Sequence, residues 1–218
     1  MSNPLNHIAI IDYGMGNLHS VSKALQHVGE NVKISVTADP TVINSADRVV
    51  FPGVGAIGDC MSEILRLDIG NILKNCIHHK PVLAICIGMQ ALLEHSEESG
   101  GVDCLKIVPG KVRQFDHHNT GPSGDKIKVP HMGWNAVEQC ADHPLWNGIE
   151  QYSRFYFVHS YYAEAQGNTH TAAYCDYGVK FAAAMSYENL FAVQFHPEKS
   201  AKGGLQLLWN FSNWVVQS

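Results

Sequence analysis

Residues 81–90 read PVLAICIGMQ, an apolar run that meets a cysteine and then, two residues later, a glycine. The run 81–85 contains no polar residue, which is typical of a strand whose two faces are both covered, as in a parallel sheet. A helix-like stretch follows Cys86. The sequence therefore predicts a strand-to-helix turn with a thiol at its tip, and the rest of the chain indicates which fold surrounds that turn.

Short apolar runs alternate with helical patterns through the N-terminal half of the chain. In the helical patterns, apolar residues recur at a spacing of three and four, as on one face of a helix. The predicted elements are strands at 7–11, 32–36, 48–51 and 81–85, and helices at 17–28 and 56–77, the last with a break at Gly70-Asn71. This strand–helix order predicts a parallel sheet with helices on both faces.

The pattern changes after about residue 100, where strand-like pieces follow each other with short turns. We expect antiparallel strands here that extend or flank the sheet, and then a closing helix. The strand-like pieces lie near 105–115, 126–130, 154–158, 171–174, 181–186 and 191–195, and the helix at about 203–216. The chain as a whole predicts an α/β fold, a three-layer sandwich with a mostly parallel central sheet and antiparallel strands in its C-terminal half.

Composition narrows the class of protein. The chain has 218 residues, 45% of them hydrophobic, which fits one domain over 1–218. The net charge of −5 gives no basic field for nucleic acid, and no apolar run is long enough to span a membrane. The N-terminus has no signal-peptide pattern, and six cysteines without a C-x-x-C pair suggest reduced thiols in a cytoplasm.

Metal and nucleotide sites are disfavoured by the motifs. The doublets His78-His79 and His117-His118 cannot place both rings on one face of a helix or strand, and no H-E-x-x-H accompanies them. DYGMGN (12–17) is at best a weak dinucleotide loop, because His19 stands where the third glycine would be. We therefore expect no metal and no cofactor.

Three glycine-containing segments follow predicted strands: DYGMGN (12–17), PGVG (52–55) and CIGMQ (86–90). Sites in open α/β sheets form beyond the carboxyl ends of the strands. The three segments are therefore expected to be neighbours in space.

A-I-C-I-G (84–88) has the form of a nucleophile elbow. Small residues two before and two after the nucleophile, here Ala84 and Gly88, allow the backbone to turn sharply and present the side chain. The turn also points the amide of Ile87 at the same space, and a helix N-terminus favours a thiolate. A lone cysteine at the end of a core strand would ordinarily be a buried thiol, but the glycine and helix start favour Cys86 as a nucleophile.

FAVQFHPEKS (191–200) supplies a candidate base and its orienting group. His196 follows a predicted strand, and in extended backbone Glu198 would lie on the same side two residues later. Glu198 could then accept from one ring nitrogen while the other faces the thiol. A surface His-Pro-Glu turn is the alternative, and the presence of an elbow elsewhere in the same chain favours a Cys86–His196–Glu198 triad instead.

An oxyanion formed by attack on a carbonyl needs hydrogen-bond donors. The amide of Ile87 is one candidate, and PGVGA (52–56) offers others, because its glycines let backbone amides approach a ligand closely. A plain strand-to-helix turn would also explain PGVG.

Together these motifs make the chain resemble the class I (triad) glutamine amidotransferases, which have a flavodoxin-like fold. The order of six segments resembles most the members that form the glutamine amidotransferase subunit of imidazole glycerol phosphate synthase, in histidine biosynthesis. Those segments are IDYGMGN (11–17), FPGVGA (51–56), CIGMQALLEHSEE (86–98), VPHMGWN (129–135), YFVHSYY (156–162) and QFHPEKS (194–200). The match spans about residues 7 to 216, and Ala84 is a small departure, since many amidotransferases have glycine there.

The resemblance implies that glutamine is hydrolysed to glutamate and ammonia through a thioester on Cys86. It implies that His196 moves the protons and that Glu198 orients it. It places the amides of Gly53 and Val54 beside that of Ile87 at the oxyanion. The residues implied to bind the substrate are Gly55, Gln90, Glu98, Ser160 and Tyr161.

The resemblance also implies a partner, because in this family a separate (β/α)8 cyclase subunit receives the ammonia in a heterodimer. The positions similar to that interface are Asn17, Pro130, Met132, Trp134 and Lys199. Trp134 is the strongest anchor on physical grounds, since exposed Trp is a frequent hot spot of interfaces. A partly buried core Trp is the alternative.

Three other hypotheses remain open. One is an amidotransferase serving anthranilate, guanylate or pyridoxal phosphate synthesis, which PGVGA, GWN and HSYY speak against. Another is a Cys-His hydrolase with the same elbow, which the positions of Gln90 and Glu198 disfavour. The third is a binding protein without activity, which the full triad disfavours.

Overall fold

The computed structural model describes residues 6–29, 31–116, 119–120, 126–164 and 169–216. The N-terminal half alternates strand and helix as its apolar periodicity predicts, and β1, β3 and β4 are buried along most of their length. Its elements are β1 (Asn6–Ile11), α1 (Leu18–Val28), β2 (Val32–Thr37), α2 (Pro40–Ser45), β3 (Arg48–Gly53), α3 (Ile57–Arg66), α4 (Ile69–His79), β4 (Val82–Cys86) and α5 (Ile87–Ala91).

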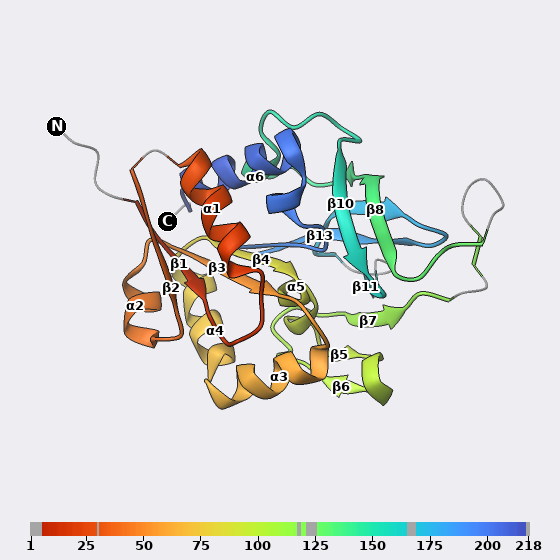
Figure 1. The fold of residues 1–218 in the computed structure, drawn as a ribbon, viewed down its shortest axis with the longest axis horizontal. Coiled ribbons are helices and arrows are strands. Elements are labelled where there is room, and N and C mark those ends of the chain that lie inside the picture. The colour runs from red at the N-terminus through yellow and green to blue at the C-terminus, as the bar shows by residue number, and fades with distance from the viewer. Residues whose placement is uncertain (1–5, 30, 117–118, 121–125, 165–168, 217–218) are drawn as a thin grey trace.

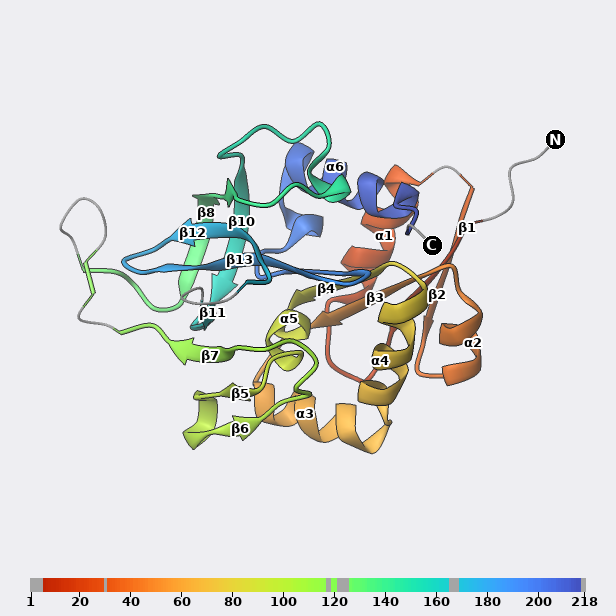
Figure 2. The same ribbon diagram turned by 180° about the vertical axis from the view of Figure 1, so that it is seen from behind.

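Five neighbouring strands form the parallel centre of the sheet, in the order β2-β1-β3-β4-β14, where β14 is Leu190–Val193. Helices cover both faces (Figures 1 and 2). On one face α1 contacts α6 (Ala201–Asn213), and on the other lie α3 and α4, with α2 packed against α4. The three-layer α/β fold predicted from the sequence is confirmed.

The remaining strands extend the sheet in mostly antiparallel fashion, as expected for the C-terminal half. Beyond β14 the order continues β13-β11-β7-β5-β6, with β12 on the other edge of β13 and β9 beside β12. Their bounds are β5 His95–Ser96, β6 Val102–Asp103, β7 Lys111–Gln114, β9 Glu138–Gln139, β11 Tyr161–Glu164, β12 Thr171–Asp176 and β13 Lys180–Tyr187. The described part of the chain also has three short 3-10 turns: Glu98–Gly100, Pro144–Trp146 and Pro197–Lys199.

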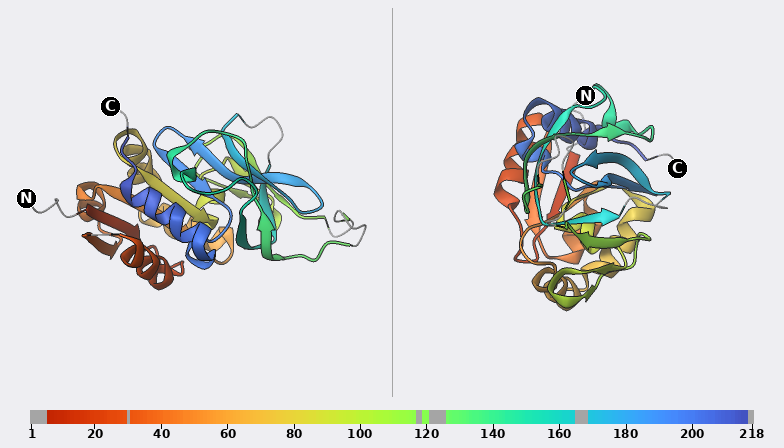
Figure 3. Two further views of the ribbon diagram at one scale, coloured as in Figure 1. Left: turned by 90° about the horizontal axis from the view of Figure 1, so that it is seen from above. Right: turned by 90° about the vertical axis from the view of Figure 1, so that its right-hand side faces the viewer.

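A separate two-stranded ribbon pairs β8 (His131–Ala136) with β10 (Arg154–His159). It stands across the end of the sheet beside β11 and β13 (Figures 1 and 3). Its strands expose Met132 and Trp134 on one side and bury His131 and His159 on the other. The ribbon therefore joins a solvent-facing surface to the interior of the molecule.

Two sequence predictions are corrected in position. The break in the helical stretch 56–77 lies at Leu67 and Asp68, where Asp68 adopts a left-handed φ of 54°, and not at Gly70-Asn71. Gly70 lies inside α4, where an added Cβ would come 2.7 Å from Leu105 Cδ2, so packing explains this glycine. The strand expected near 126–130 begins instead at His131, because Pro130 has no N–H for a ladder hydrogen bond.

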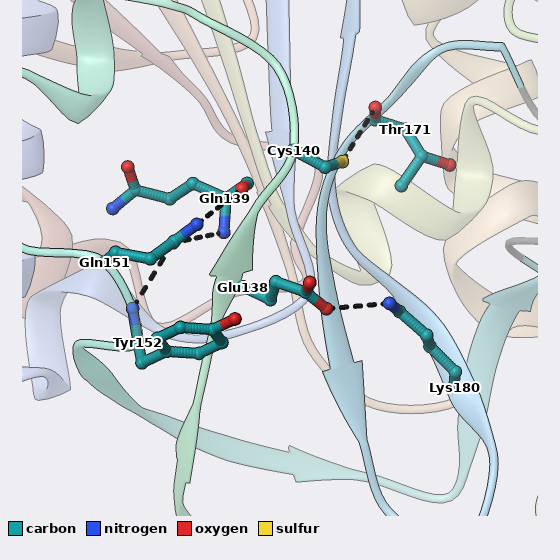
Figure 4. A network of polar contacts seen from close by, with 7 residues as sticks. All are labelled: Glu138, Gln139, Cys140, Gln151, Tyr152, Thr171 and Lys180. Carbon is teal, nitrogen blue, oxygen red and sulfur yellow. Dashed lines mark hydrogen bonds and ion pairs between the residues drawn. The ribbon is translucent and has the colours of Figure 1, made fainter.

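Polar contacts link β9 to neighbouring segments at the far edge of the sheet (Figure 4). Gln139 N–H donates to Gln151 Oε1 at 2.7 Å, and Lys180 pairs with Glu138 at 2.7 Å. The exposed Cys140 donates to the carbonyl of Thr171 at 3.4 Å. The Cys140 thiol therefore lies at the edge of the sheet, away from the end of β4.

The described residues contain no membrane-spanning helix and no cluster of metal ligands. No helix there is both long enough and apolar enough to span a membrane. No group of three or more His, Cys, Asp or Glu side chains there is arranged to hold a metal ion. Residues 117–118, which include one of the histidine doublets, lie outside the described part of the chain.

Candidate active site

The turn between β4 and α5 has the backbone of a nucleophile elbow. Cys86 has φ 55° and ψ −111°, a backbone conformation that residues other than glycine rarely adopt and that recurs at functional sites. A Cβ at Gly88 would lie 2.1 Å from the carbonyl oxygen of Phe51 on β3. Only glycine fits this approach, which explains the small residue that the motif requires.

A cavity of about 430 Å³ opens at this end of the sheet. Its wall combines the loop after β3, the elbow, the segment after β10 and the turn after β14. Parallel pairing of β3, β4 and β14 brings the loop, the elbow and the turn together. The residues that line it are Val54, Gly55, Cys86, Ile87, Gln90, Glu98, Pro130, Val158, His159, Ser160, Tyr161, His196 and Lys199.

Cys86, His196 and Glu198 lie together in one series. The Cys86 thiol is close enough to His196 to raise the pKa of that ring, and His196 Nδ1 lies 2.9 Å from Glu198 Oε1. The side chains of His196 and Glu198 are 3% and 1% exposed. The contact exists although the backbone differs from the expectation: Pro197–Lys199 is a 3-10 turn, and only His196 is extended. The turn, and not a two-residue strand period, brings Glu198 back to the ring.

Electrostatics favour a charged His196. Burial alone would lower its pKa, but the hydrogen bonds and charges of Cys86 and Glu198 outweigh burial and raise the pKa to about 10. Among the described residues, Glu198 Oε2 has no hydrogen-bond partner, so His196 is the main group that stabilises this buried carboxylate. The arrangement suits an imidazolium that has taken a proton from the thiol.

Two buried amides extend the series on the side of the thiol. Gln194 Nε2 lies 3.6 Å from Cys86 Sγ, and Gln194 Oε1 accepts from Gln90 Nε2 at 2.9 Å. Gln194 was not predicted as a site residue, although it belongs to the segment QFHPEKS. Its side chain points at the sulfur only because β14 lies beside β4, and this pairing is a property of the fold that residue spacing does not contain.

All five predicted substrate-binding residues line the cavity: Gly55, Gln90, Glu98, Ser160 and Tyr161. The Glu98 carboxylate also accepts from the amide of Ile57, at the start of α3, at 3.2 Å. The cavity wall therefore combines the carboxylate of Glu98 with backbone groups of the loop after β3. Their roles remain predictions.

The predicted oxyanion residues divide into two groups. Val54 and Ile87 line the cavity, whereas Gly53 lies just behind it, paired in register with Cys86. Two residues absent from the prediction hold this loop: Tyr13 Oη donates to the Pro52 carbonyl at 2.9 Å, and Cys60 Sγ donates to the Val54 carbonyl at 3.5 Å. Tyr13 belongs to the segment DYGMGN and Cys60 lies six residues after Val54, but neither pattern indicates a contact with this loop.

The five predicted interface residues fall in three places. Pro130 and Lys199 line the mouth of the cavity, and Asn17 precedes α1. Met132 and Trp134 lie on the ribbon, 62% and 42% exposed. Trp134 meets Tyr156 edge-on at 6.2 Å between ring centroids, so it is a surface residue and not the core residue of the alternative hypothesis.

Comparisons with known proteins agree with this geometry. The family model described as glutamine amidotransferase class-I matches residues 9–213. A relative from Pseudomonas putida, named imidazole glycerol phosphate synthase subunit HisH, is 58% identical over 95% of this chain and 97% of its own. A protein of the same name from Acinetobacter baylyi is 55% identical over 97% of this chain and 100% of its own.

Solved structures with low sequence identity share the fold. A putative GMP synthase protein from Thermoplasma acidophilum superposes with a TM-score of 0.70 at 18% identity, covering 97% of this chain and 94% of that one. PurLQS from Thermotoga maritima gives a TM-score of 0.66 at 15% identity, covering 95% of this chain and 97% of that one. These likenesses concern the fold alone.

Proposed function

Because the chain belongs to the class I glutamine amidotransferases, we propose that it is the glutaminase subunit of imidazole glycerol phosphate synthase and that Cys86 is its nucleophile. Glutamine is hydrolysed to glutamate and ammonia, and the ammonia serves the synthase. The observation that carries the chemistry is the buried Cys86–His196–Glu198 series in the wall of the cavity. The full-length relatives carry the assignment to this synthase.

Covalent catalysis begins with the sulfur. His196 takes the thiol proton, and the thiolate attacks the carboxamide carbon of glutamine to form a C–S bond and an oxyanion. Gln194, within 3.6 Å of the sulfur, supplies a second donor that stabilises the thiolate. The amides of Val54 and Ile87, in the cavity wall, are the candidate donors to the oxyanion.

The proton returns in the second half of the reaction. His196 gives its proton to the amine, the C–N bond breaks, and ammonia leaves a thioester on Cys86. His196 then takes a proton from water, hydroxide attacks the thioester, and glutamate leaves as the thiol is restored. Glu198 keeps the ring oriented in both steps, because its carboxylate accepts from Nδ1. One water is consumed for each ammonia released.

The chain needs a partner that uses the ammonia, and we assign that role to a cyclase subunit in a heterodimer. The relatives are named as subunits, which supports a complex. Two features fit docking at the ribbon: its outer side exposes Met132 and Trp134, and Pro130 and Lys199 lie where the cavity opens. We expect the complex in the cytoplasm, where the other enzymes of amino-acid biosynthesis work.

The docking surface is tested with two matched tryptophans. Trp134→Ala should weaken the heterodimer by roughly 10–30-fold, because an exposed Trp at an interface centre commonly contributes about 2 kcal/mol. Trp209→Ala is the control, since Trp209 is 48% exposed but lies on α6, next to α1. Dissociation constants come from sedimentation of the tagged chain with the cyclase.

The same preparations test the coupling. Glutamate release by the chain alone should be slow and should rise when the cyclase and its phosphorylated ligand are present. Equal association of the Trp134→Ala and unaltered chains would remove the ribbon from the interface. Equal turnover with and without the cyclase would contradict the assigned partner.

A further inference from the structure

Two buried histidines lie beside the cavity and have no part in the proposed chemistry. His131 on β8 and His159 on β10 are register partners in the ribbon, 3% and 6% exposed. His159 lines the cavity, whereas His131 lies behind it. Their rings are joined by a hydrogen bond of 3.0 Å between His131 Nδ1 and His159 Nε2.

The direction of this hydrogen bond is fixed by its neighbours. His159 Nδ1 lies 2.8 Å from the carbonyl oxygen of Tyr161, which can only accept, so Nδ1 carries the proton. The unprotonated Nε2 of His159 then accepts from His131 Nδ1–H. His131 Nε2 accepts in turn from the side-chain amide of Asn135, at 3.4 Å. Both rings are therefore neutral and protonated on Nδ1.

The surroundings agree with neutral rings. Burial lowers the pKa of His131 to about 4, and burial next to a second histidine lowers the pKa of His159 to about 3. His131 is stacked on Tyr177, with ring centroids 3.9 Å apart. A charged His159 would also place two donors against each other across the 3.0 Å contact.

The series ends on a carbonyl that belongs to the substrate site. Tyr161 O accepts a second hydrogen bond from Gln90 Nε2 at 2.9 Å, and the preceding carbonyl of Ser160 accepts from Phe115 N–H at 3.2 Å. Ser160 and Tyr161 thereby have their carbonyls directed into the protein. Their remaining backbone and side-chain groups form the cavity wall.

We propose that His131 and His159 are positioning residues for glutamine, which hold the Tyr161 carbonyl and with it the Ser160–Tyr161 part of the binding site. The inference rests on the proposed function and adds to it a link between the docking ribbon and the substrate. Loss of the link loosens the wall that binds glutamine and leaves the Cys86–His196–Glu198 series in place. It therefore weakens binding more than it slows the chemistry.

His131→Phe is the decisive variant, because it keeps an aromatic ring at a position that does not line the cavity. In the complex with the cyclase, its KM for glutamine should rise about 3–10-fold, as expected for one lost hydrogen bond, with kcat changed less than the KM. His131→Asn keeps an N–H donor near the position of Nδ1 and should restore most of the lost affinity.

His143→Phe is the matched control. His143 is also a buried histidine with a pKa lowered by burial to about 4, but it packs on Phe191 and Trp214, and it does not line the cavity. Its KM should equal that of the unaltered chain. A folded His131→Phe chain with unchanged KM, or one that loses kcat alone, would overturn the proposal.

Nitrogen NMR of the unaltered complex tests the same proposal without a variant. His131 and His159 should both be neutral Nδ1–H tautomers at pH 7, whereas His143 should be protonated on Nε2, because its Nδ1 accepts from the amide of Leu145. An Nε2–H tautomer of His159 would overturn the proposal even if His131→Phe failed to fold. Failure of the proposed function appears separately, as absence of glutamine hydrolysis by the unaltered complex.

Discussion

The raised pKa of His196 depends first on the Cys86 thiol and next on the buried carboxylate of Glu198. Its Oε1 lies 2.9 Å from Nδ1 of that ring, and the pair is almost fully buried. A single buried charge is costly, so the pair is stable only while His196 carries a proton. The free energy of unfolding should therefore depend on whether this ring is protonated.

The sign of the pH effect follows from the raised pKa. His196 in the unfolded chain has a pKa near 6.5, and in the folded protein a pKa of about 10. Its contribution is complete below pH 6.5 and is lost as the pH rises toward 10, because the folded state binds the extra proton. Between pH 7 and 9 the melting temperature should fall, and the fall should be shallower in Glu198→Gln, which lacks the charge.

Melting curves of both proteins at the two pH values measure this difference. An equal or steeper fall in the variant would show that the carboxylate does not raise the pKa of His196.

At this scale the sequence predicted the residues that short motifs mark. Cys86 stands in an elbow pattern, and His196 and Glu198 stand two apart beyond a strand. Gln194 and Tyr13 were missed, because each acts on a group that is distant in sequence and close only after β1, β3, β4 and β14 have paired. Cys60 was missed although Val54 is only six residues away, because no motif indicates a hydrogen bond from a thiol to a backbone carbonyl. The reason given for the His196–Glu198 contact was wrong as well, since a 3-10 turn makes it.

Among the elements, the elbow has the strictest steric demand. The helix α5 starts against β3, and Gly88 leaves no room for a methyl group there, because the obstructing atom is a backbone oxygen that cannot rotate away. Gly58 in α3 differs: a Cβ there would have its nearest neighbour at 3.9 Å. The two glycines therefore form a matched pair.

Gly88→Ala should destabilise the protein by about 1–3 kcal/mol, the usual cost of overpacking, and should lower kcat by moving the thiol. Gly58→Ala should be neutral or stabilising by up to about 1 kcal/mol, because alanine favours a helix interior. Urea unfolding of both variants gives the free energies. Equal stabilities for the two variants would show that the turn accommodates a side chain at position 88.

Elements with long periodic patterns were predicted well, and short ones were not. The capped helix α2 was missed although Asp39 accepts from Thr41 N–H at 2.8 Å and Pro40 follows it, a local signal for a helix start. The strands β5, β6 and β9 have two residues each, too few for any periodicity. Their pairing is decided by the longer strands beside them.

At the scale of the whole molecule, the site is assembled from segments that lie far apart in the chain. The thiol ends β4, and β14, which leads to His196, lies beside β4 in parallel register, with Val193 opposite Ile85. The antiparallel half supplies the opposite wall of the cavity through Val158, Ser160 and Tyr161. The order of strands could be inferred from a family resemblance, whereas residue spacing predicted only that the strand ends would be neighbours.

We infer that this assembly makes Cys86, one of six cysteines in the chain, a nucleophile toward glutamine. The sharpest test is mass spectrometry of the complex after exposure to an electrophilic glutamine analogue, with Cys140→Ser and Cys86→Ser as the two variants. We expect a single adduct on Cys86 in the unaltered and Cys140→Ser chains, and neither adduct nor glutamate release in Cys86→Ser. An adduct on another cysteine, or glutamate release that survives in Cys86→Ser, would contradict it.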